Sequence, residues 1–256
     1  MRLSKHRPCR RSDQRESRAF RARPAALFLP QSKFLLRGGQ DPMAESPYIV
    51  SLLICVATEF EASILRDQIG ELPRVRLIVT GVGPVNAAHA ATVAIIEEAP
   101  EAIVVCGVGG AYPSSGLRVG DVASAEIEIY GDLGAESPSG FMDMKTLGFP
   151  VVASPTPLFN EIPMQVFPTA GRARFVTVSM CTGSDEKARQ IESRTRGGVE
   201  NMEGAAVAHV SRLHGIAVGE VRGISNIVTN RDTKSWKLKE AAAAAQTALL
   251  DWIDRR

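Results

Sequence analysis

Two glutamates in this chain stand where a carboxylate could do chemistry. The first, Glu203, follows Met202 and precedes a run of small and apolar residues, GAAVAHV, that predicts a closely packed helix beginning near Met202. In the first turn of that helix, the carboxylate could accept hydrogen bonds from two vicinal hydroxyls of a sugar, with Met202 as an apolar floor. It could equally be an acid stabilised by the helix macrodipole, by about 0.3–1 kcal/mol. Position alone leaves both interpretations open.

The second glutamate, Glu61, follows an apolar run over 48–56 that is typical of a buried parallel strand. Residues 57–67 then have helical spacing, and the junction of a strand with a helix N-terminus is where open α/β sheets bind ligands. Thr58 and Glu61 also have the S/T-x-x-E spacing of a capping box. Glu61 is therefore either a helix cap or a functional carboxylate.

Glycines cluster after two further expected strands, over 75–80 and 102–106. The clusters consist of Gly81 and Gly83, and of Gly107, Gly109 and Gly110. Neither forms GxGxxG with an acidic residue after the next strand, and neither contains Gly-Lys-Ser/Thr. We therefore expect a pocket lined by backbone groups and no nucleotide cofactor.

The remaining elements alternate between strands and helices. Further strands are expected over 123–130, half exposed, and over 174–179 and 216–224, the last ending in Ser-Asn. Helices are expected towards Glu98 and over 184–194, from Met202 to a glycine cap at Gly215, and over 237–253. Residues 131–157 have the composition of a long loop or lid. This pattern predicts one three-layer α/β domain with a mixed or largely parallel sheet.

Composition excludes several classes of protein. The chain has 256 residues, 45% of them hydrophobic and 23% charged, as in ordinary globular domains. Its longest apolar runs fall far short of the ~20 residues of a membrane span. The four cysteines are scattered without metal-ligand spacing, and three lie in or beside apolar runs. We expect buried thiols in a reducing compartment and no metal.

The first 42 residues differ from the rest in charge. They carry 11 Lys and Arg against 3 Asp and Glu, whereas the remainder carries 19 against 25. Such an arm could bind nucleic acid or direct the chain to an organelle. It has no amphipathic pattern, however, and Met43 directly precedes the first apolar run. We expect a disordered or mis-started extension over 1–42 and a working domain over 43–256.

Taken together, several segments from Tyr48 to the C-terminus resemble the nucleoside phosphorylase and nucleosidase superfamily. Within it, Glu-Asn-Met-Glu-Gly and the loop Gly-Asp-Leu-Gly-Ala-Glu are similar to those of the futalosine hydrolases. The segments that carry the resemblance are ATEFEASILRDQIG, TGVGPVNAA, GVGGAYPSSGLRVGDV, GDLGAESPSGFMDMKTLGFP, VENMEGAAVAHV and GISNIVTNRD.

The resemblance implies a three-layer α/β/α domain with a mixed central sheet that hydrolyses an N-ribosidic bond. Glu61 would orient and deprotonate the attacking water, and Glu203 would bind the ribose hydroxyls beside Met202. Gly107, Gly109 and Gly110 would lie near the sugar, and Asn226 would face the purine. The resemblance also implies a cytoplasmic homo-oligomer that needs only a nucleoside and water, with no cofactor, membrane or nucleic acid.

Asn226 departs from the pattern of the adenosine-type nucleosidases, which have an aspartate acting as an acid towards the purine at this position. An amide cannot transfer a proton in that way, so water or Asp232, six residues on, is the alternative donor. The amide could instead donate a hydrogen bond to the O6 atom of a 6-oxopurine.

Three other functions fit some of the same residues, the first being that of an adenosine-type nucleosidase. A purine nucleoside phosphorylase would need a basic phosphate receptor, but no Arg or Lys lies between Gly81 and Ala91. A non-catalytic nucleoside-binding module would bind tightly without turnover. Assays with and without phosphate separate the latter two from hydrolysis.

Overall fold

The computed structural model describes residues 51–255, except 71, 73, 169 and 170. The proposed arm over 1–42, the domain start at Met43 and the first residues of the strand expected over 48–56 lie outside the described residues, as does Cys9.

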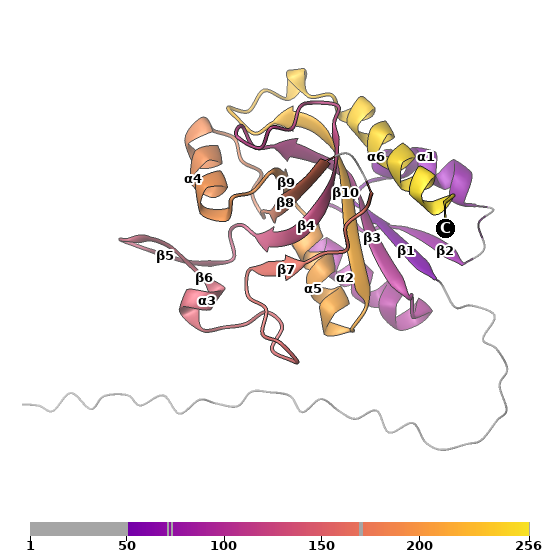
Figure 1. Ribbon diagram of the computed structural model, residues 1–256, viewed down its shortest axis with the longest axis horizontal. Helices are drawn as coiled ribbons and strands as arrows, with labels where there is room; N and C mark the ends of the chain where they lie inside the picture. Colours follow the sequence, from indigo (N-terminus) through magenta and orange to yellow (C-terminus); the bar gives the residue numbers. More distant parts are fainter. Residues whose placement is uncertain (1–50, 71, 73, 169–170, 256) are drawn as a thin grey trace, which may run out of the picture. The chain divides into compact units, whose positions relative to one another are not determined.

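An eight-stranded mixed sheet forms the centre of the domain (Figure 1). Strand β10 pairs with both β3 and β4, so the order β10-β4-β8-β9-β3 closes into a ring, which β1 and β2 extend beyond β3 and β7 beyond β4. Strands β1, β2, β3 and β10 run parallel to their neighbours in that group, whereas β4 is antiparallel to β10, and β9 to β3. The strands are β1 (Leu52–Val56), β2 (Val75–Val79), β3 (Ala102–Ala111), β4 (Val122–Tyr130), β7 (Glu161–Pro163), β8 (Gly171–Thr177), β9 (Val199–Asn201) and β10 (Ala217–Ile227).

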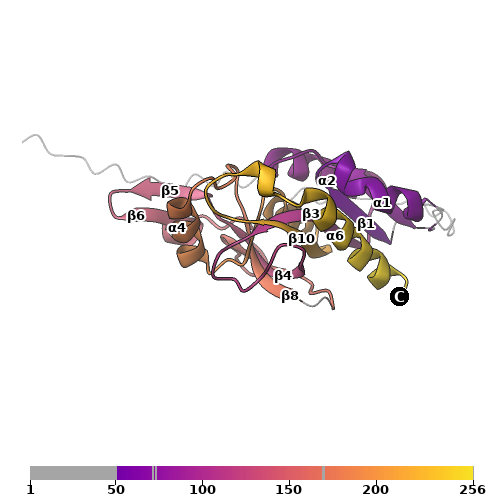
Figure 2. The ribbon, with the colours of Figure 1, turned by 90° about the horizontal axis from the view of Figure 1, so that it is seen from above.

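Helices cover both faces of this sheet (Figures 1 and 2). Small residues of α2 and α5 pack with Leu53 and Val105 in one core. Leu65 of α1 and Leu249 of α6 pack with Ile54 in a second core. The predicted three-layer α/β/α architecture with a mixed sheet is therefore confirmed. The main helices are α1 (Glu59–Ile69), α2 (Pro84–Glu98), α4 (Asp185–Thr195), α5 (Gly204–Leu213) and α6 (Leu238–Ile253).

Three expectations need correction. Two strands are longer than expected: β3 continues beyond Cys106 through residues 107–111, and β10 continues through Ser225 and Asn226. Residues 131–157 are not structureless: they include a projecting hairpin, β5 (Gly134–Ser137) and β6 (Gly140–Asp143), followed by the short helix α3 (Met144–Leu147) (Figure 1).

The third correction concerns β4, which is mostly buried and not half exposed. Glu126 and Glu128 are two positions apart, which in a regular strand places them on the same face. A bulge between Ala125 and Ile127 breaks that alternation, so Glu126 is exposed while Glu128 is fully buried. No residue pattern in the strand predicted this bulge.

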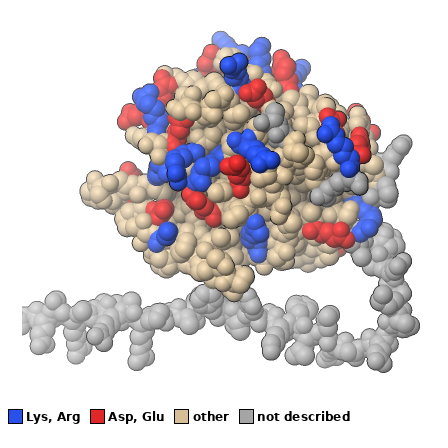
Figure 3. Space-filling model, in the orientation of Figure 1, with Lys and Arg blue, Asp and Glu red and all other residues tan. Residues whose placement is uncertain are grey.

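The described cysteines fit the expected buried thiols only in part. Cys55 and Cys106 are free and buried, and burial raises the pKa of Cys55 to about 12. Cys181 is free but only half buried. No helix in the described part of the chain is both long and apolar enough to cross a membrane. On the face in Figure 3, basic and acidic side chains are interspersed.

Candidate active site

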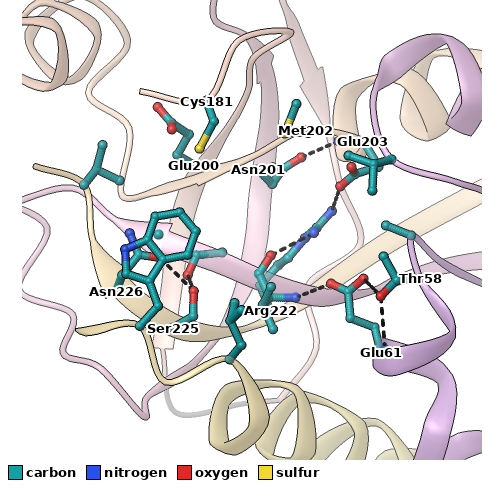
Figure 4. Close-up of a pocket in the computed structure, with 18 of the residues that line it drawn as sticks. Thr58, Glu61, Cys181, Glu200, Asn201, Met202, Glu203, Arg222, Ser225 and Asn226 are labelled. Carbon is teal, nitrogen blue, oxygen red and sulfur yellow. Dashed lines mark hydrogen bonds and ion pairs between the residues drawn. The ribbon is translucent and has the colours of Figure 1, made fainter. Parts of the chain in front are cut away.

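A cavity of about 250 Å³ opens where α1, β3, β10 and the β9–α5 junction meet (Figure 4). Its lining includes six of the residues singled out from the sequence, namely Glu61, Gly109, Gly110, Met202, Glu203 and Asn226. Among the residues that the structure describes, no group of His, Cys, Asp or Glu side chains could hold a metal ion.

Glu203 is the N-cap residue of α5 and lies one position before the helix, not in its first turn. Its side chain makes no capping hydrogen bond; instead Asn201 Oδ1 accepts from the backbone N–H groups of Glu203 and Gly204, at 3.0 and 2.8 Å. The buried Glu203 carboxylate accepts from Gly83 N at 3.0 Å and from Arg222 Nη2 at 3.2 Å. Because Asn201 satisfies the start of the helix, the carboxylate of Glu203 faces the cavity.

Glu61 is only half of a capping box. Thr58 Oγ1 accepts from Glu61 N at 3.3 Å, as a cap should, but the Glu61 carboxylate does not return to the Thr58 backbone. Its Oε1 accepts from Val108 N on β3 at 2.9 Å, and its Oε2 accepts from Thr58 Oγ1 at 2.9 Å. The capping interpretation therefore accounts for the Thr58 side chain and the Glu61 backbone, and leaves the buried Glu61 carboxylate at the cavity wall.

Gly107 explains how Glu61 reaches β3. A Cβ atom at position 107 would lie 2.5 Å from Glu61 Oε1 and 3.1 Å from Arg222 Nη1, both too close. Gly107 thus packs against Glu61, while Gly109 and Gly110 line the cavity.

Arg222 is a site residue that the sequence analysis missed. It is buried between the two glutamates, with Nη2 on Glu203 and Nη1 donating to Val108 O at 2.9 Å. Nε donates to Glu220 Oε1 at 2.7 Å. Burial alone would lower the pKa of the guanidinium, but Glu220, Glu203 and Glu61 raise it above its usual value. Glu220 and Arg222 are two positions apart in an apolar strand, and that spacing could have revealed a buried ion pair on one face.

The two residues considered for the purine lie in different places. Asn226 is half buried on the cavity wall; its Nδ2 donates to Ile227 O at 3.1 Å, and its Oδ1 accepts from Ser225 Oγ at 2.8 Å. Asp232 is exposed, does not line the cavity, and caps the short 3-10 helix η1 (Thr233–Ser235). The structure therefore brings Asn226, but not Asp232, to the site.

Glu200 is a third carboxylate at the wall, and its hydrogen bonds are internal. Tyr112 Oη and Thr182 Oγ1 donate to its Oε2 at 2.7 and 2.5 Å, and Thr182 N donates to Oε1 at 2.9 Å. These hydrogen bonds hold the Glu200 carboxylate in place against Tyr112 and Thr182. Trp236 also lines the cavity, with the Arg231 guanidinium 4.9 Å from its ring centroid.

Comparison with known proteins places this fold and site in a class. A family model described as the phosphorylase superfamily matches residues 55–254, so the chain belongs to that superfamily. The futalosine hydrolase of Streptomyces coelicolor is 35% identical, with 68% of this chain and 76% of that protein covered. The futalosine hydrolase of Thermus thermophilus is 32% identical, with 66% and 77% covered. Within the superfamily, the chain therefore belongs to the futalosine hydrolases.

A solved structure agrees in fold. The 5′-methylthioadenosine/S-adenosylhomocysteine nucleosidase of Neisseria meningitidis, in complex with methylthio-immucillin-A, superposes with a TM-score of 0.69. The superposition covers 81% of this chain and all of the other, at 19% identity.

Proposed function

We propose that this chain hydrolyses the N-ribosidic bond of futalosine and releases hypoxanthine and dehypoxanthine futalosine. The observation that carries the proposal is the pair of buried carboxylates, Glu61 and Glu203, on one cavity with Arg222 between them (Figure 4). Neither carboxylate accepts a hydrogen bond from a backbone N–H at the start of its own helix. The choice of futalosine as the substrate is supported by the sequence similarity to futalosine hydrolases of other organisms.

In this proposal, Glu203 binds the ribose. Each of its carboxylate oxygens accepts one hydrogen bond from the protein, and each can accept another from a vicinal hydroxyl. As the glycosidic bond stretches, the sugar gains positive charge, and a fixed carboxylate stabilises that charge more in the transition state than in the ground state. Met202, on the same wall, provides the apolar contact to the sugar.

Glu61 acts on the nucleophile. Val108 N and Thr58 Oγ1 fix its two oxygens, which leaves each with a lone pair for a water molecule in the cavity. Glu61 would orient that water and accept its proton as the water attacks the anomeric carbon. The proposed reaction includes no metal or organic cofactor.

Asn226 would face the leaving purine. One N–H of its amide donates to Ile227 O, and the other can donate to the O6 acceptor of hypoxanthine. Because the amide cannot supply a proton to the purine and Asp232 lies away from the cavity, we assign that proton to water.

We place the reaction in the alternative pathway of menaquinone biosynthesis, in the cytoplasm, with the enzyme as a homo-oligomer and residues 1–42 as an extension of the working domain. No nucleic acid or membrane partner is part of this proposal.

A product assay tests the proposal. Purified protein is incubated with futalosine, aminodeoxyfutalosine, inosine and methylthioadenosine, each with and without phosphate. We expect phosphate-independent release of hypoxanthine from futalosine at the highest rate. Phosphate-dependent cleavage of inosine would instead indicate a phosphorylase, and tight binding of futalosine without turnover would indicate a binding module.

A further inference from the structure

A second pair of carboxyl groups lies behind the cavity. Glu128 of β4 and Glu220 of β10 are both completely buried. They meet beside Gly204, the first residue of α5, where an added Cβ atom would collide with both Glu220 Oε2 and Glu128 Oε1. Glycine at position 204 therefore leaves room for two carboxyl oxygens to approach each other.

The hydrogen bonds around this pair leave one gap. Glu128 Oε1 accepts from Asn201 Nδ2 at 2.6 Å, and Glu128 Oε2 accepts from Thr177 Oγ1 at 2.8 Å. Glu220 Oε1 accepts from Arg222 Nε at 2.7 Å. Glu220 Oε2 is buried and accepts from no donor of the described residues, while Glu128 Oε1 is its neighbour beside Gly204. If both groups were ionised, two acceptors would face each other; one proton between them makes a hydrogen bond.

The surrounding charges favour that proton. The groups that face the pair are Arg222 from β10, Thr177 from β8 and Asn201 from β9, with Glu203 and Glu61 beyond Arg222. Tyr130 of β4 and Cys106 of β3 are also close enough to interact electrostatically with Glu128 and Glu220, respectively, but both are neutral at neutral pH because their pKa values are raised. Arg222 is the only buried Lys or Arg of the described chain, against five buried glutamates. Burial and the neighbouring Glu220 raise the pKa of Glu128 well above its usual value, and Thr177 and Arg222 offset this only in part.

We infer that Glu128 and Glu220 share one proton, and that the pair, with a single negative charge, is a positioning device for Arg222. The pair binds Arg222 at Nε, which directs Nη2 to Glu203 and Nη1 to the carbonyl of Val108. The contact with Glu220, at 2.7 Å, is shorter than that with Glu203, at 3.2 Å. Glu220 therefore shares the Arg222 charge, and Glu203 keeps more of its negative charge for the sugar than it would beside an otherwise unpaired Arg222, in the reaction proposed above.

Two glutamine variants test this inference because they place the charge differently. In Glu220→Gln, the amide oxygen can accept from Arg222 Nε and the amide nitrogen can donate to ionised Glu128. The hydrogen bonds are kept, but the negative charge moves one residue away from Arg222. In Glu128→Gln, the charge stays on Glu220, while one of the donors to Glu128, Asn201 Nδ2 or Ile129 N, loses its acceptor.

If the pair positions Arg222, the variant that loses more kcat should not be the variant that loses more thermal stability. We expect Glu220→Gln to lower kcat on futalosine by about tenfold or more with little change in KM, because Arg222 then neutralises Glu203. Glu128→Gln should lose less kcat although it loses more thermal stability. A merely structural role predicts the reverse order for kcat, since Glu128→Gln breaks more contacts. That reverse order would overturn the inference.

The shared proton has a readout that needs no turnover. In deuterated buffer near neutral pH, the infrared carbonyl-stretch band of a buried protonated carboxyl group should be present in the full-length wild type. It should be absent in both Glu128→Gln and Glu220→Gln, and unchanged in Glu186→Gln, which removes an exposed carboxylate of α4. A band that persists in both variants would show that the pair does not share a proton. Because this measurement is independent of substrate, it stands even if futalosine is not cleaved.

Discussion

The Glu203 carboxylate accepts a hydrogen bond from the backbone N–H of Gly83, a residue 120 positions earlier in the chain. Gly83 is the N-cap of α2 and has a φ of 94°, a conformation that glycine adopts without strain. The glycine turn after β2 therefore contacts the residue that precedes α5, and α2 and α5 pack on the same face of the sheet. Gly83, from the glycine cluster that predicted a pocket, and Glu203, the proposed sugar ligand, therefore belong to the same site.

Glu203→Gln should lower turnover far more than stability. The amide keeps the shape of the side chain but loses the negative charge, and preorganised electrostatic groups of this kind contribute about 2.7–4 kcal/mol to catalysis. We expect kcat/KM on futalosine to fall by about 10²–10³-fold with little change in Tm, because Asn201 caps α5.

Ser184→Ala is the matched control for a true cap. Ser184 Oγ accepts from Lys187 N at the start of α4. Its removal should cost about 0.5–2 kcal/mol of stability and leave kcat unchanged. If Glu203→Gln behaved like Ser184→Ala, Glu203 would be a cap and not a sugar ligand.

Glu61→Gln should remove the base and keep the binding site. The amide oxygen can still accept from Val108 N, so the side chain stays in place. We expect a fall in kcat of about 10²–10⁴-fold, the usual contribution of a general base, with substrate affinity retained. Rapid-quench turnover and equilibrium binding of futalosine measure the two effects separately. Joint loss of binding and turnover would assign Glu61 a structural role.

Gly107→Ala should act through Glu61. The added methyl group would lie 2.5 Å from Glu61 Oε1, so the carboxylate must move away from Val108 N. We expect kcat to fall by about tenfold or more, because small displacements of a catalytic group are costly. The control is Gly70→Ala, at a position with φ of −53° and no atom closer than 3.8 Å to the new Cβ, which should leave kcat unchanged. Equal kcat in both variants would contradict the role of Gly107.

Stability should decline, in a way that depends on Glu128, as pH rises above the ordinary pKa of glutamate. Its pKa is raised in the folded protein, chiefly by burial and by Glu220. A raised folded pKa gives stability that is fully present below the ordinary pKa of glutamate and is lost as pH rises through the folded value. Thermal unfolding measured from about pH 4 upward should show the Tm of the wild type falling towards that of Glu128→Gln. Parallel Tm curves would show that Glu128 does not titrate in this range.

Much of the fold could be predicted because its signals are local. Continuous apolar runs marked the parallel strands, and Ser184 and Gly215 marked helix ends where the structure has them. The bulge in β4 could not be predicted, because nothing in the strand itself requires it; it follows from the pairing with β8. The burial of Glu128 was missed for that reason.

The site was predicted in part. Residue type and position left Glu61 and Glu203 as either helix caps or functional carboxylates, and the resemblance to nucleosidases favoured the functional role. The structure brings both carboxylates to one cavity. Arg222 was missed because charged residues in a strand are usually interpreted as exposed, although buried charges do occur when they are paired. Its partners lie on three different elements, and only the folded chain brings them together.

Substitution of Asn226 should change the choice of purine. If the Asn226 amide donates to O6, Asn226→Asp should weaken the use of futalosine and improve the use of aminodeoxyfutalosine, because an ionised carboxylate repels O6 and accepts from an exocyclic amine. A buried polar mismatch costs about 1–3 kcal/mol, so the preference should change by about tenfold or more. The 6-amino substrate should also gain in kcat at low pH, where the protonated carboxyl group of the Asn226→Asp variant can donate to N7.

The measurement for Asn226→Asp is kcat/KM for both substrates across pH, in wild type and variant. The variant also loses the hydrogen bond from Nδ2 to Ile227 O, so a fall in Tm is expected and the ratio of the two kcat/KM values, not either value alone, decides the matter. An unchanged ratio would show that groups other than Asn226 recognise the base.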